Sequence, residues 1–84
     1  MDDILALGQK VIIRTVTHYY TGEIIDIKDG FVFLGTAAWI PNTGRWNAAL
    51  KTGKLEETEA FVDPVAVSLS VIVDVTKWRH ALPQ

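Results

Sequence analysis

The most constraining feature of this sequence is an apolar run that directly follows a turn signal. The dipeptide Asp29-Gly30 is typical of a two-residue hairpin turn, and the residues after it, Phe31–Leu34, read FVFL. Because successive side chains of a strand point to opposite faces, this strand is apolar on both sides. One face can fill the interior of a small barrel. The other needs cover, either from the N-terminal segment of the chain or from a neighbouring subunit.

The size of the chain makes such cover valuable. Its 84 residues form one domain, and a domain of this length buries only roughly 60 to 65% of the surface that its unfolded chain exposes. Cysteine is absent, which excludes disulfides and thiolate zinc sites. A hydrophobic content of 49% and a charged content of 21% are typical of an ordered globule. The net charge of −2 provides no basic field that would attract nucleic acid from a distance.

Neither a membrane span nor an export signal is predicted. No apolar run approaches the roughly 20 residues that a membrane-spanning helix needs. The first ten residues, MDDILALGQK, carry two acids where a secretory signal would carry positive charge. The sequence therefore favours a cytoplasmic protein with no membrane partner.

Runs of β-branched and apolar residues predict a mainly β fold. The expected strands cover residues 10–17, 20–28, 31–39, 64–69 and 70–76. Gly22 lies inside the second of them and indicates a bend or bulge, as the corner of a small barrel requires.

Two short helices are expected beside these strands. Acids followed by Ile4–Leu7 and then glycine predict an N-terminal helix of one to two turns. The second helix follows Thr43 as its cap and ends at Gly53, inside an insert of about residues 41–60. We therefore expect a single domain over residues 1–84. It is a small, strongly bent, five-stranded antiparallel barrel with an N-terminal helix and a helical insert between the third and fourth strands.

Three patches of sequence carry a resemblance to a known family. Residues 5–11 run from the expected helix into the first strand. Residues 20–34, YTGEIIDIKDGFVFL, place a glycine in the second strand and then an aliphatic residue, a turn and an apolar third strand. Residues 67–75, VSLSVIVDV, occupy the position of a second turn and a final strand. In this order the patches resemble the two motifs of the Sm/LSm (Hfq-like) family of small barrels.

The resemblance implies a homo-oligomeric ring of about five to seven subunits. In such rings the fourth strand of one barrel pairs with the fifth strand of the next, and the inner rim binds uridine-rich or adenine-rich RNA. The chain departs from the family at the RNA-contacting positions. The asparagine of the first motif is replaced by Phe31 or Val32, depending on the register, and the Arg-Gly of the second motif by Ser68-Leu69. The usual base pocket is therefore not expected in its usual form.

Two sets of residues are the candidate sites. The candidate RNA contacts lie in the two family loops and are Lys28, Asp29, Gly30, Ser68 and Ser70. The alternative is a plain hairpin turn, with serines that cap their own backbone. The candidate subunit interface consists of apolar strand residues: Phe31, Phe33, Val65, Val67, Val71 and Val73.

Aromatic residues outside these sets offer a further surface for nucleic acid. Tyr19, Tyr20, Trp39 and Trp46 could stack on bases. Single-stranded nucleic acid is bound by aromatics set among positive charge, and here three glutamates follow close behind the few cations. Packing of these rings in the core or at an interface is therefore favoured.

The remaining polar residues do not form a catalytic or metal-binding pattern. His18 and His80 each lack a second ligand at metal-binding spacing. Asp26 and Asp74 lie within strand patterns, where one of them can pair with Arg14 across the sheet. The sequence predicts no enzyme, no metal or cofactor, and no small-molecule substrate.

Two functions remain open. The first is a ring-forming Sm-like module with an altered RNA-binding or RNA-chaperone role. The second is a scaffold ring without nucleic acid, which binds proteins through residues 45–55. In both, apolar contact should drive assembly. An interface of about 1,600 Å² gains roughly 20 kcal/mol before association costs, against about 0 to 1 kcal/mol for a surface ion pair.

Overall fold

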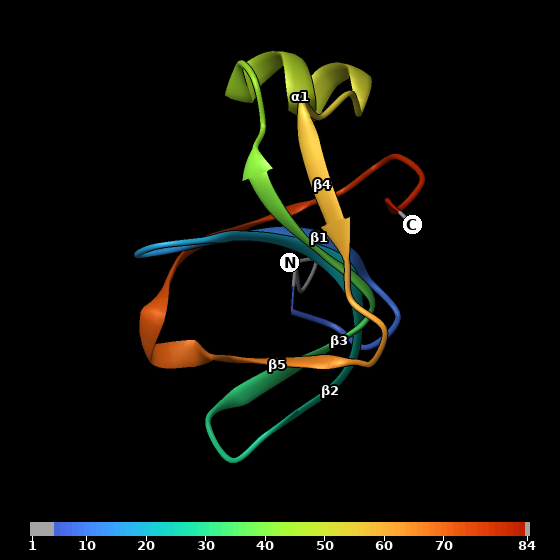
Figure 1. Cartoon of the computed structure of the whole chain (residues 1–84). Helices are drawn as coiled ribbons and strands as arrows, with labels where there is room; N and C mark the ends of the chain where they lie inside the picture. The colour runs from blue at the N-terminus through green and yellow to red at the C-terminus, as the bar shows by residue number, and fades with distance from the viewer. Residues whose placement is uncertain (1–4, 84) are drawn as a thin grey trace.

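A strongly bent antiparallel sheet dominates the computed structural model, which describes residues 5–83. Its elements, in chain order, are β1 (Lys10–Thr15), β2 (Tyr19–Lys28), β3 (Phe31–Asn42), α1 (Trp46–Thr52), β4 (Glu57–Ala60), β5 (Val65–Ser68), the 3-10 turn η1 (Leu69–Val71) and β6 (Ile72–Lys77). The strands are ordered β4-β3-β2-β1-β6, and β5 also pairs with β3. In Figure 1 the sheet curls so that β1 lies above the interior and β5 below it.

The β2–β3 hairpin forms as the sequence predicts. Asp29 and Gly30 have φ angles of 54° and 81°, the left-handed conformation that a two-residue hairpin turn requires at both positions. The pairing of β2 with β3 shifts register between Thr21 and Glu23, so Gly22 marks a bulge, as expected. A second shift follows between Ile24 and Asp26. These shifts bend the long hairpin and allow the sheet to curl.

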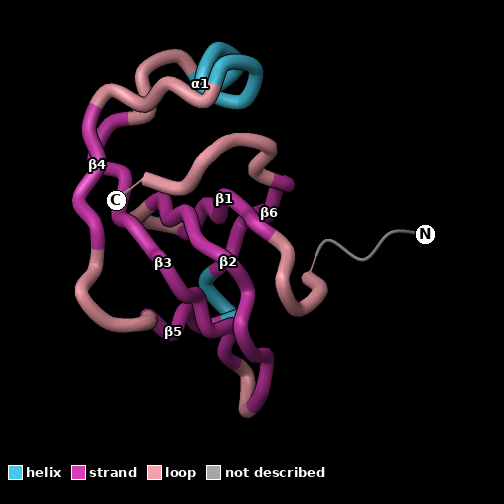
Figure 2. Tube along the Cα trace, turned by 90° about the vertical axis from the view of Figure 1, so that its right-hand side faces the viewer, coloured by secondary structure: helices cyan, strands magenta, loops and turns pink. Residues whose placement is uncertain are grey.

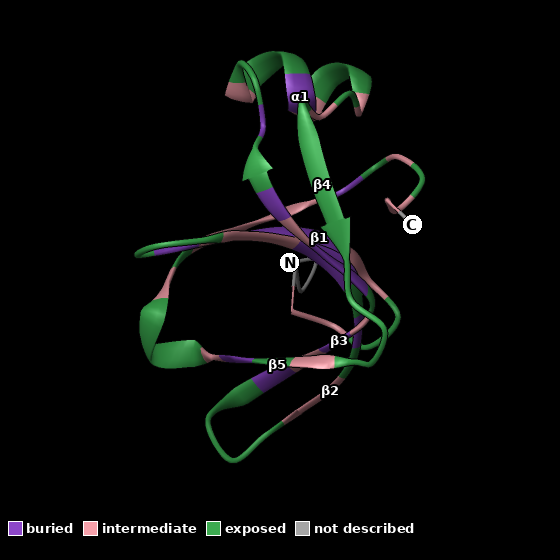
Figure 3. Cartoon of the chain, viewed as in Figure 1, coloured by how far each residue is buried: buried purple, intermediate pink, exposed green. Residues whose placement is uncertain are grey.

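The interior of the barrel is filled from one face of each strand. Val32 and Leu34 are fully buried, whereas Phe31 is 41% exposed and Phe33 is half-buried. The core contains Val11, Ile13, Ile24, Val32, Leu34, Ala37 and Val67. Figure 3 shows the buried residues gathered where β1, β2 and β3 cross, while α1 and β4 are mostly exposed. The outer face of the FVFL run is thus only partly covered by the chain itself.

The helices differ in part from the expectation. Residues 5–8 form turns, and the rest of the expected N-terminal helix lies outside the described residues. Helix α1 follows β3 and ends at Gly53, whose φ of 77° is the left-handed conformation expected there. Thr43 is not its cap, because Arg45 occupies that position and makes no side-chain capping bond. The Thr43 hydroxyl instead donates to the carbonyl oxygen of Gly44 over 2.9 Å.

Two strands also depart from the predicted bounds. We expected the third strand to end near Trp39 because of Pro41, yet β3 continues to Asn42. Pro41 is tolerated because the pairing of β3 with β4 is irregular between Trp39 and Asn42, where no ladder N–H is needed. The glutamate-rich segment after α1, which is not among the five expected strands, forms the short edge strand β4, whose four residues are all exposed.

The C-terminal tail fastens α1 to the barrel. Trp78 is buried and anchors the tail, and its indole N–H donates to the carbonyl oxygen of Ala81 over 3.1 Å. The Lys10 ammonium donates to the carbonyl oxygen of His80 over 2.7 Å, and a ring nitrogen of His80 lies 2.9 Å from the carbonyl oxygen of Leu50. Figure 2 shows α1 and β4 extending beyond the barrel at one end. None of the helices in residues 5–83 has the length and apolar character to span a membrane.

Candidate functional site

The two predicted RNA-contacting loops lie side by side. Phe31 is paired with Ser68 in the ladder between β3 and β5. One step further along, the backbone N–H of Leu69 donates to the carbonyl oxygen of Gly30 over 2.9 Å. The ladder therefore brings Lys28–Gly30 and Ser68–Ser70 to the same end of the barrel, although about 40 residues separate them in sequence.

The polar groups of these loops are partly engaged with each other. The hydroxyls of Ser68 and Ser70 are 2.9 Å apart, and the Ser68 hydroxyl accepts from the backbone N–H of Ser70 over 3.3 Å, capping η1. The Lys28 ammonium lies 3.7 Å from a carboxylate oxygen of Asp26 and 5.8 Å from the centre of the Phe33 ring. The loops thus present two hydroxyls, the Asp29 carboxylate and one cation, which is already paired with Asp26.

Two sheet edges flank this cluster. Strand β5 pairs with β3 on one side only, and β6 pairs with β1 on one side only. Within residues 5–83 no ladder joins β5 to β6, although η1 connects them directly. Since alternate residues of an antiparallel strand direct their backbone groups away from the partner strand, both edges carry N–H and C=O groups that a further strand can bond.

Exposed apolar side chains gather at these edges. Val73 is 61% exposed on β6, and Phe31, Leu69 and Val71 are between 37% and 41% exposed beside the loops. Phe33 and Val65 of the predicted interface are half-buried. Val67 is different: it lies in the core of the chain, so its side chain is not part of an exposed surface.

Arg14 and Asp74 form an ion pair across the ladder between β1 and β6. The Arg14 Nε donates to both carboxylate oxygens of Asp74, over 3.0 and 2.9 Å, and its terminal nitrogen bonds the same carboxylate. These bonds lower the pKa of the Asp74 carboxyl and raise that of the guanidinium, while desolvation opposes both shifts. The sequence offered Asp26 and Asp74 as alternative partners of Arg14, and the structure shows that Asp74 is the partner.

A concave region lies at the other end of the β2–β3 hairpin, away from the Lys28–Gly30 and Ser68–Ser70 loops. It is a hollow of about 480 Å³ between the β1–β2 turn and the C-terminal part of β3. Its walls are Thr15, Val16, Thr17, His18, Tyr19, Trp39, Ile40, Pro41, Asn42 and Thr43. Sequence reasoning named Tyr19 and Trp39 as stacking candidates. It did not include His18 in this region, because nothing in the local sequence pattern indicates that the β1–β2 turn faces residues 39–43.

The described residues contain no cluster of three or more histidine or acidic side chains that could hold a metal ion.

Comparison with known proteins identifies the fold. No family model matches the sequence, and no curated protein is significantly similar to it in sequence. Among solved structures, a heptameric archaeal Sm protein matches with a TM-score of 0.60 at 12% sequence identity. The match covers 84% of this chain and 87% of that chain. The chain thus has an Sm-like fold, which confirms the resemblance drawn from the sequence.

Proposed function

We propose that this Sm-like chain assembles into a closed homo-oligomeric ring, in which β5 of one subunit pairs with β6 of the next. The observation that carries this proposal is that β5 and β6 are each paired on one side only and lie next to one another along the chain. A contact between two different edges is head-to-tail, and repeated around a circle it pairs the β5 and β6 edges of every subunit. The archaeal Sm protein of the same fold is a heptamer.

The distribution of exposed apolar residues supports the same assembly. Val71 and Val73 lie on or beside one free edge, while Phe31 and Leu69 lie near the end of the other. Pairing of the edges would bury these side chains and complete the cover of the FVFL run. Val65 and Val67 would contribute mainly through the backbone of β5, because Val67 is already in the core.

We further propose that the cluster of Lys28, Asp29, Gly30, Ser68 and Ser70 makes a weak contact with single-stranded RNA. The support is the proximity of the two loops, held by the bond between Leu69 and Gly30. Each subunit offers one lysine and two hydroxyls beside the carboxylates of Asp26 and Asp29, so affinity would come from repetition of the contact around the ring. The contact would be with the backbone rather than with a specific base, since the family's asparagine and arginine are replaced.

Two measurements test this function. Native mass spectrometry of the purified chain should give a single closed oligomer whose mass is independent of concentration, and a monomer at micromolar concentration would contradict the ring. Polarisation titrations with labelled U-rich and A-rich RNA should show binding that weakens as salt rises. Lys28→Ala should lower the affinity for RNA relative to the parent chain. Lys51→Ala, which removes an exposed charge from α1, should leave the affinity unchanged.

A scaffold ring without nucleic acid is the second candidate. The net charge of −2 and the four exposed residues of β4, three of them acidic or polar, favour it. An intact oligomer that binds neither RNA at low salt would support this candidate and exclude the RNA contact.

A further inference from the structure

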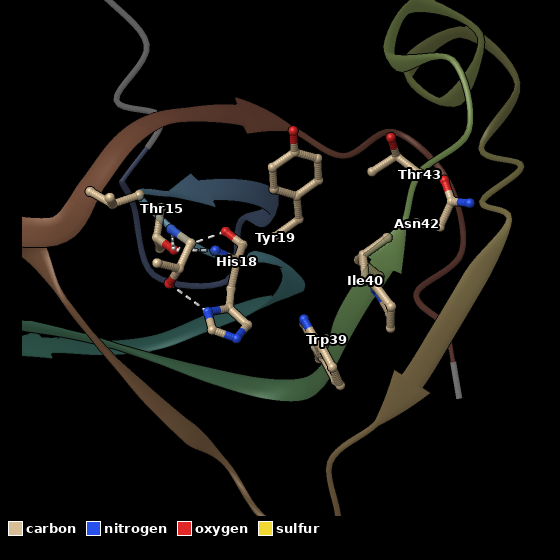
Figure 4. A pocket seen from close by; sticks show the side chains of 10 residues that line it. Thr15, His18, Tyr19, Trp39, Ile40, Asn42 and Thr43 are labelled. Carbon is tan, nitrogen blue, oxygen red and sulfur yellow. Dashed lines mark hydrogen bonds between the residues drawn. The ribbon is translucent and has the colours of Figure 1, made fainter.

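The hollow between the β1–β2 turn and the end of β3 is lined in part by aromatic rings, those of His18, Tyr19 and Trp39. The ring centres of His18 and Trp39 are 5.6 Å apart, with their planes inclined at 55°. Two rings at this angle form a corner, and Figure 4 shows the His18 and Trp39 rings next to one another, with the Tyr19 ring pointing away from them. A flat ring that stacks on one wall of the corner directs its edge toward the other wall.

These walls are held in place by the rest of the fold. Trp39 lies in the ladder between β2 and β3, opposite Tyr20, whose ring also stacks with His18 at 6.0 Å. The turn that carries His18 is fixed by the Thr15 hydroxyl, which donates to the His18 carbonyl oxygen and accepts from the His18 backbone N–H, each over 2.9 Å. A ligand therefore finds the corner already formed and does not have to order it.

Polar atoms on the same rings are available to a ligand. The Nδ1 atom of His18 is engaged with the Thr17 hydroxyl at 2.6 Å. Within the part of the chain that the structure describes, neither the His18 Nε2 nor the Trp39 indole N–H has a hydrogen-bond partner. Figure 4 shows the indole nitrogen turned toward His18. The corner thus combines two stacking faces with two hydrogen-bonding groups.

The charge of the lining narrows the class of ligand. None of the ten lining residues is a lysine, arginine, aspartate or glutamate. The hollow is therefore suited to an uncharged ring rather than to a phosphate or a carboxylate. Its volume of about 480 Å³ is within the range of small-ligand pockets, roughly 300 to 1,000 Å³.

We propose that this hollow binds a nucleobase, which stacks on Trp39 and directs its edge toward the Nε2 atom of His18. The base can belong to a free nucleoside or to single-stranded RNA held by the ring. For the second source the inference rests on the proposed function, whereas binding of a free nucleoside does not. The site is distinct from the Lys28 and Ser68 loops, which lie at the other end of the same hairpin.

The test uses uncharged nucleosides and the full chain. Adenosine, guanosine, cytidine and uridine are titrated while the indole N–H signals are followed by NMR. The signal of Trp39 is assigned as the one absent from Trp39→Phe. At least one nucleoside should shift this signal at millimolar concentration, with an affinity that does not change with salt, because no phosphate is involved.

Variants then locate the site. Trp39→Leu should weaken nucleoside binding by about tenfold, the effect of losing one stacked base. His18→Ala, at an exposed turn residue, should weaken it several-fold and serves as the deciding variant if Trp39→Leu does not fold. Lys28→Ala is the matched control and should leave nucleoside binding unchanged. Circular dichroism and a thermal melt verify each fold.

The outcomes separate this inference from the proposed function. Absence of any shift of the Trp39 signal, or equal affinities in the parent chain and His18→Ala, would overturn the nucleobase site. RNA binding that is weakened by Lys28→Ala but not by the His18 or Trp39 variants would show that no base of the bound RNA enters the hollow. It would leave the proposed function intact. Nucleoside binding at Trp39 without any RNA binding would support the pocket and remove the RNA role.

Discussion

Gly22 and Leu34 face each other so closely that no side chain fits between them. A Cβ on Gly22 would lie 2.8 Å from the Cβ of Leu34, and 3.3 Å from the carbonyl oxygen of Gly35. Leu34 is fully buried in the core, so it cannot move aside cheaply. The close contact lies at the register shift where the long β2–β3 hairpin bends. Glycine is thus required here for the curvature of the barrel.

Gly22→Ala should lower the free energy of unfolding by about 1 to 3 kcal/mol, the usual cost of overpacking a core. Chemical denaturation followed by tryptophan fluorescence measures this change. Glu23→Ala, at the next and exposed position, is the control and should change stability by less than about 0.5 kcal/mol. Equal stability of Gly22→Ala and the parent chain would show that the bend tolerates a side chain.

Val73→Lys should prevent assembly of the ring. Val73 is 61% exposed on the free side of the sheet, and a lysine at a strand edge opposes edge-to-edge pairing, because its charge would have to be buried. Light scattering coupled to size-exclusion chromatography should report a monomer. The matched control is Val62→Lys, in the connection between β4 and β5, where valine is fully exposed. If both variants keep the parent mass, β6 is not the assembly edge.

Thr21→Val should stabilise the chain. The Thr21 hydroxyl is buried and has no hydrogen-bond partner among the described residues, so the folded state bears its desolvation cost. Removing it should raise the free energy of unfolding by about 1 kcal/mol. Thr15→Val is the contrasting variant, because its hydroxyl bonds the His18 backbone, and it should be destabilising. A loss of stability in Thr21→Val would mean that this hydroxyl has a partner, such as a water molecule.

Asp74→Asn should lower the free energy of unfolding at neutral pH and should make that free energy depend less on pH in the acid range. The bonds from Arg14 place the pKa of the folded Asp74 carboxyl below the ordinary value of 3.8. The unfolded chain therefore binds the proton more tightly. The contribution of this group to stability is complete above about pH 3.8 and is lost as the pH falls through the lower folded value.

Unfolding curves measured from neutral pH into acid test this prediction. The difference between the parent chain and Asp74→Asn should be largest at neutral pH and should shrink below pH 3.8. Asp63→Asn, at an exposed position in the β4–β5 connection, controls for the general effect of removing one acid. A difference that stays constant with pH would show that the carboxylate charge is not what stabilises this ladder.

Local sequence signals predicted those parts of the fold that depend on neighbouring residues. Asp29-Gly30 and Gly53 adopt the left-handed conformations expected of them, because the steric reason for each lies within the residue itself. Thr43 was a wrong prediction for the opposite reason. A capping residue must stand directly before the helix, and the start of α1 depends on how far β3 extends. The end of β3 is in turn set by its irregular pairing with β4 around Pro41.

The candidate sites were predictable only in part. The resemblance to the Sm family grouped residues 28–30 and 68–70 in one candidate site. In the structure the two segments are in contact, because the backbone N–H of Leu69 donates to the carbonyl oxygen of Gly30. The alternation that assigned Val67 to an interface could not tell which face of β5 points inward. The hollow beside His18 and Trp39 has no local signature, because its two sides meet only through the pairing of β1, β2 and β3.

By itself, the sequence determined five of the six strands, the hairpin turn, the bend at Gly22 and a surplus of apolar strand surface. These follow from backbone sterics and from the alternation of side chains, which act over a few residues. The tertiary structure alone decided which strand edges remain open, which apolar residues stay exposed beside them, and which aromatic rings form a corner. Those features depend on ladders between segments far apart in the chain, whose registers are set by bulges and by the packing of the whole core.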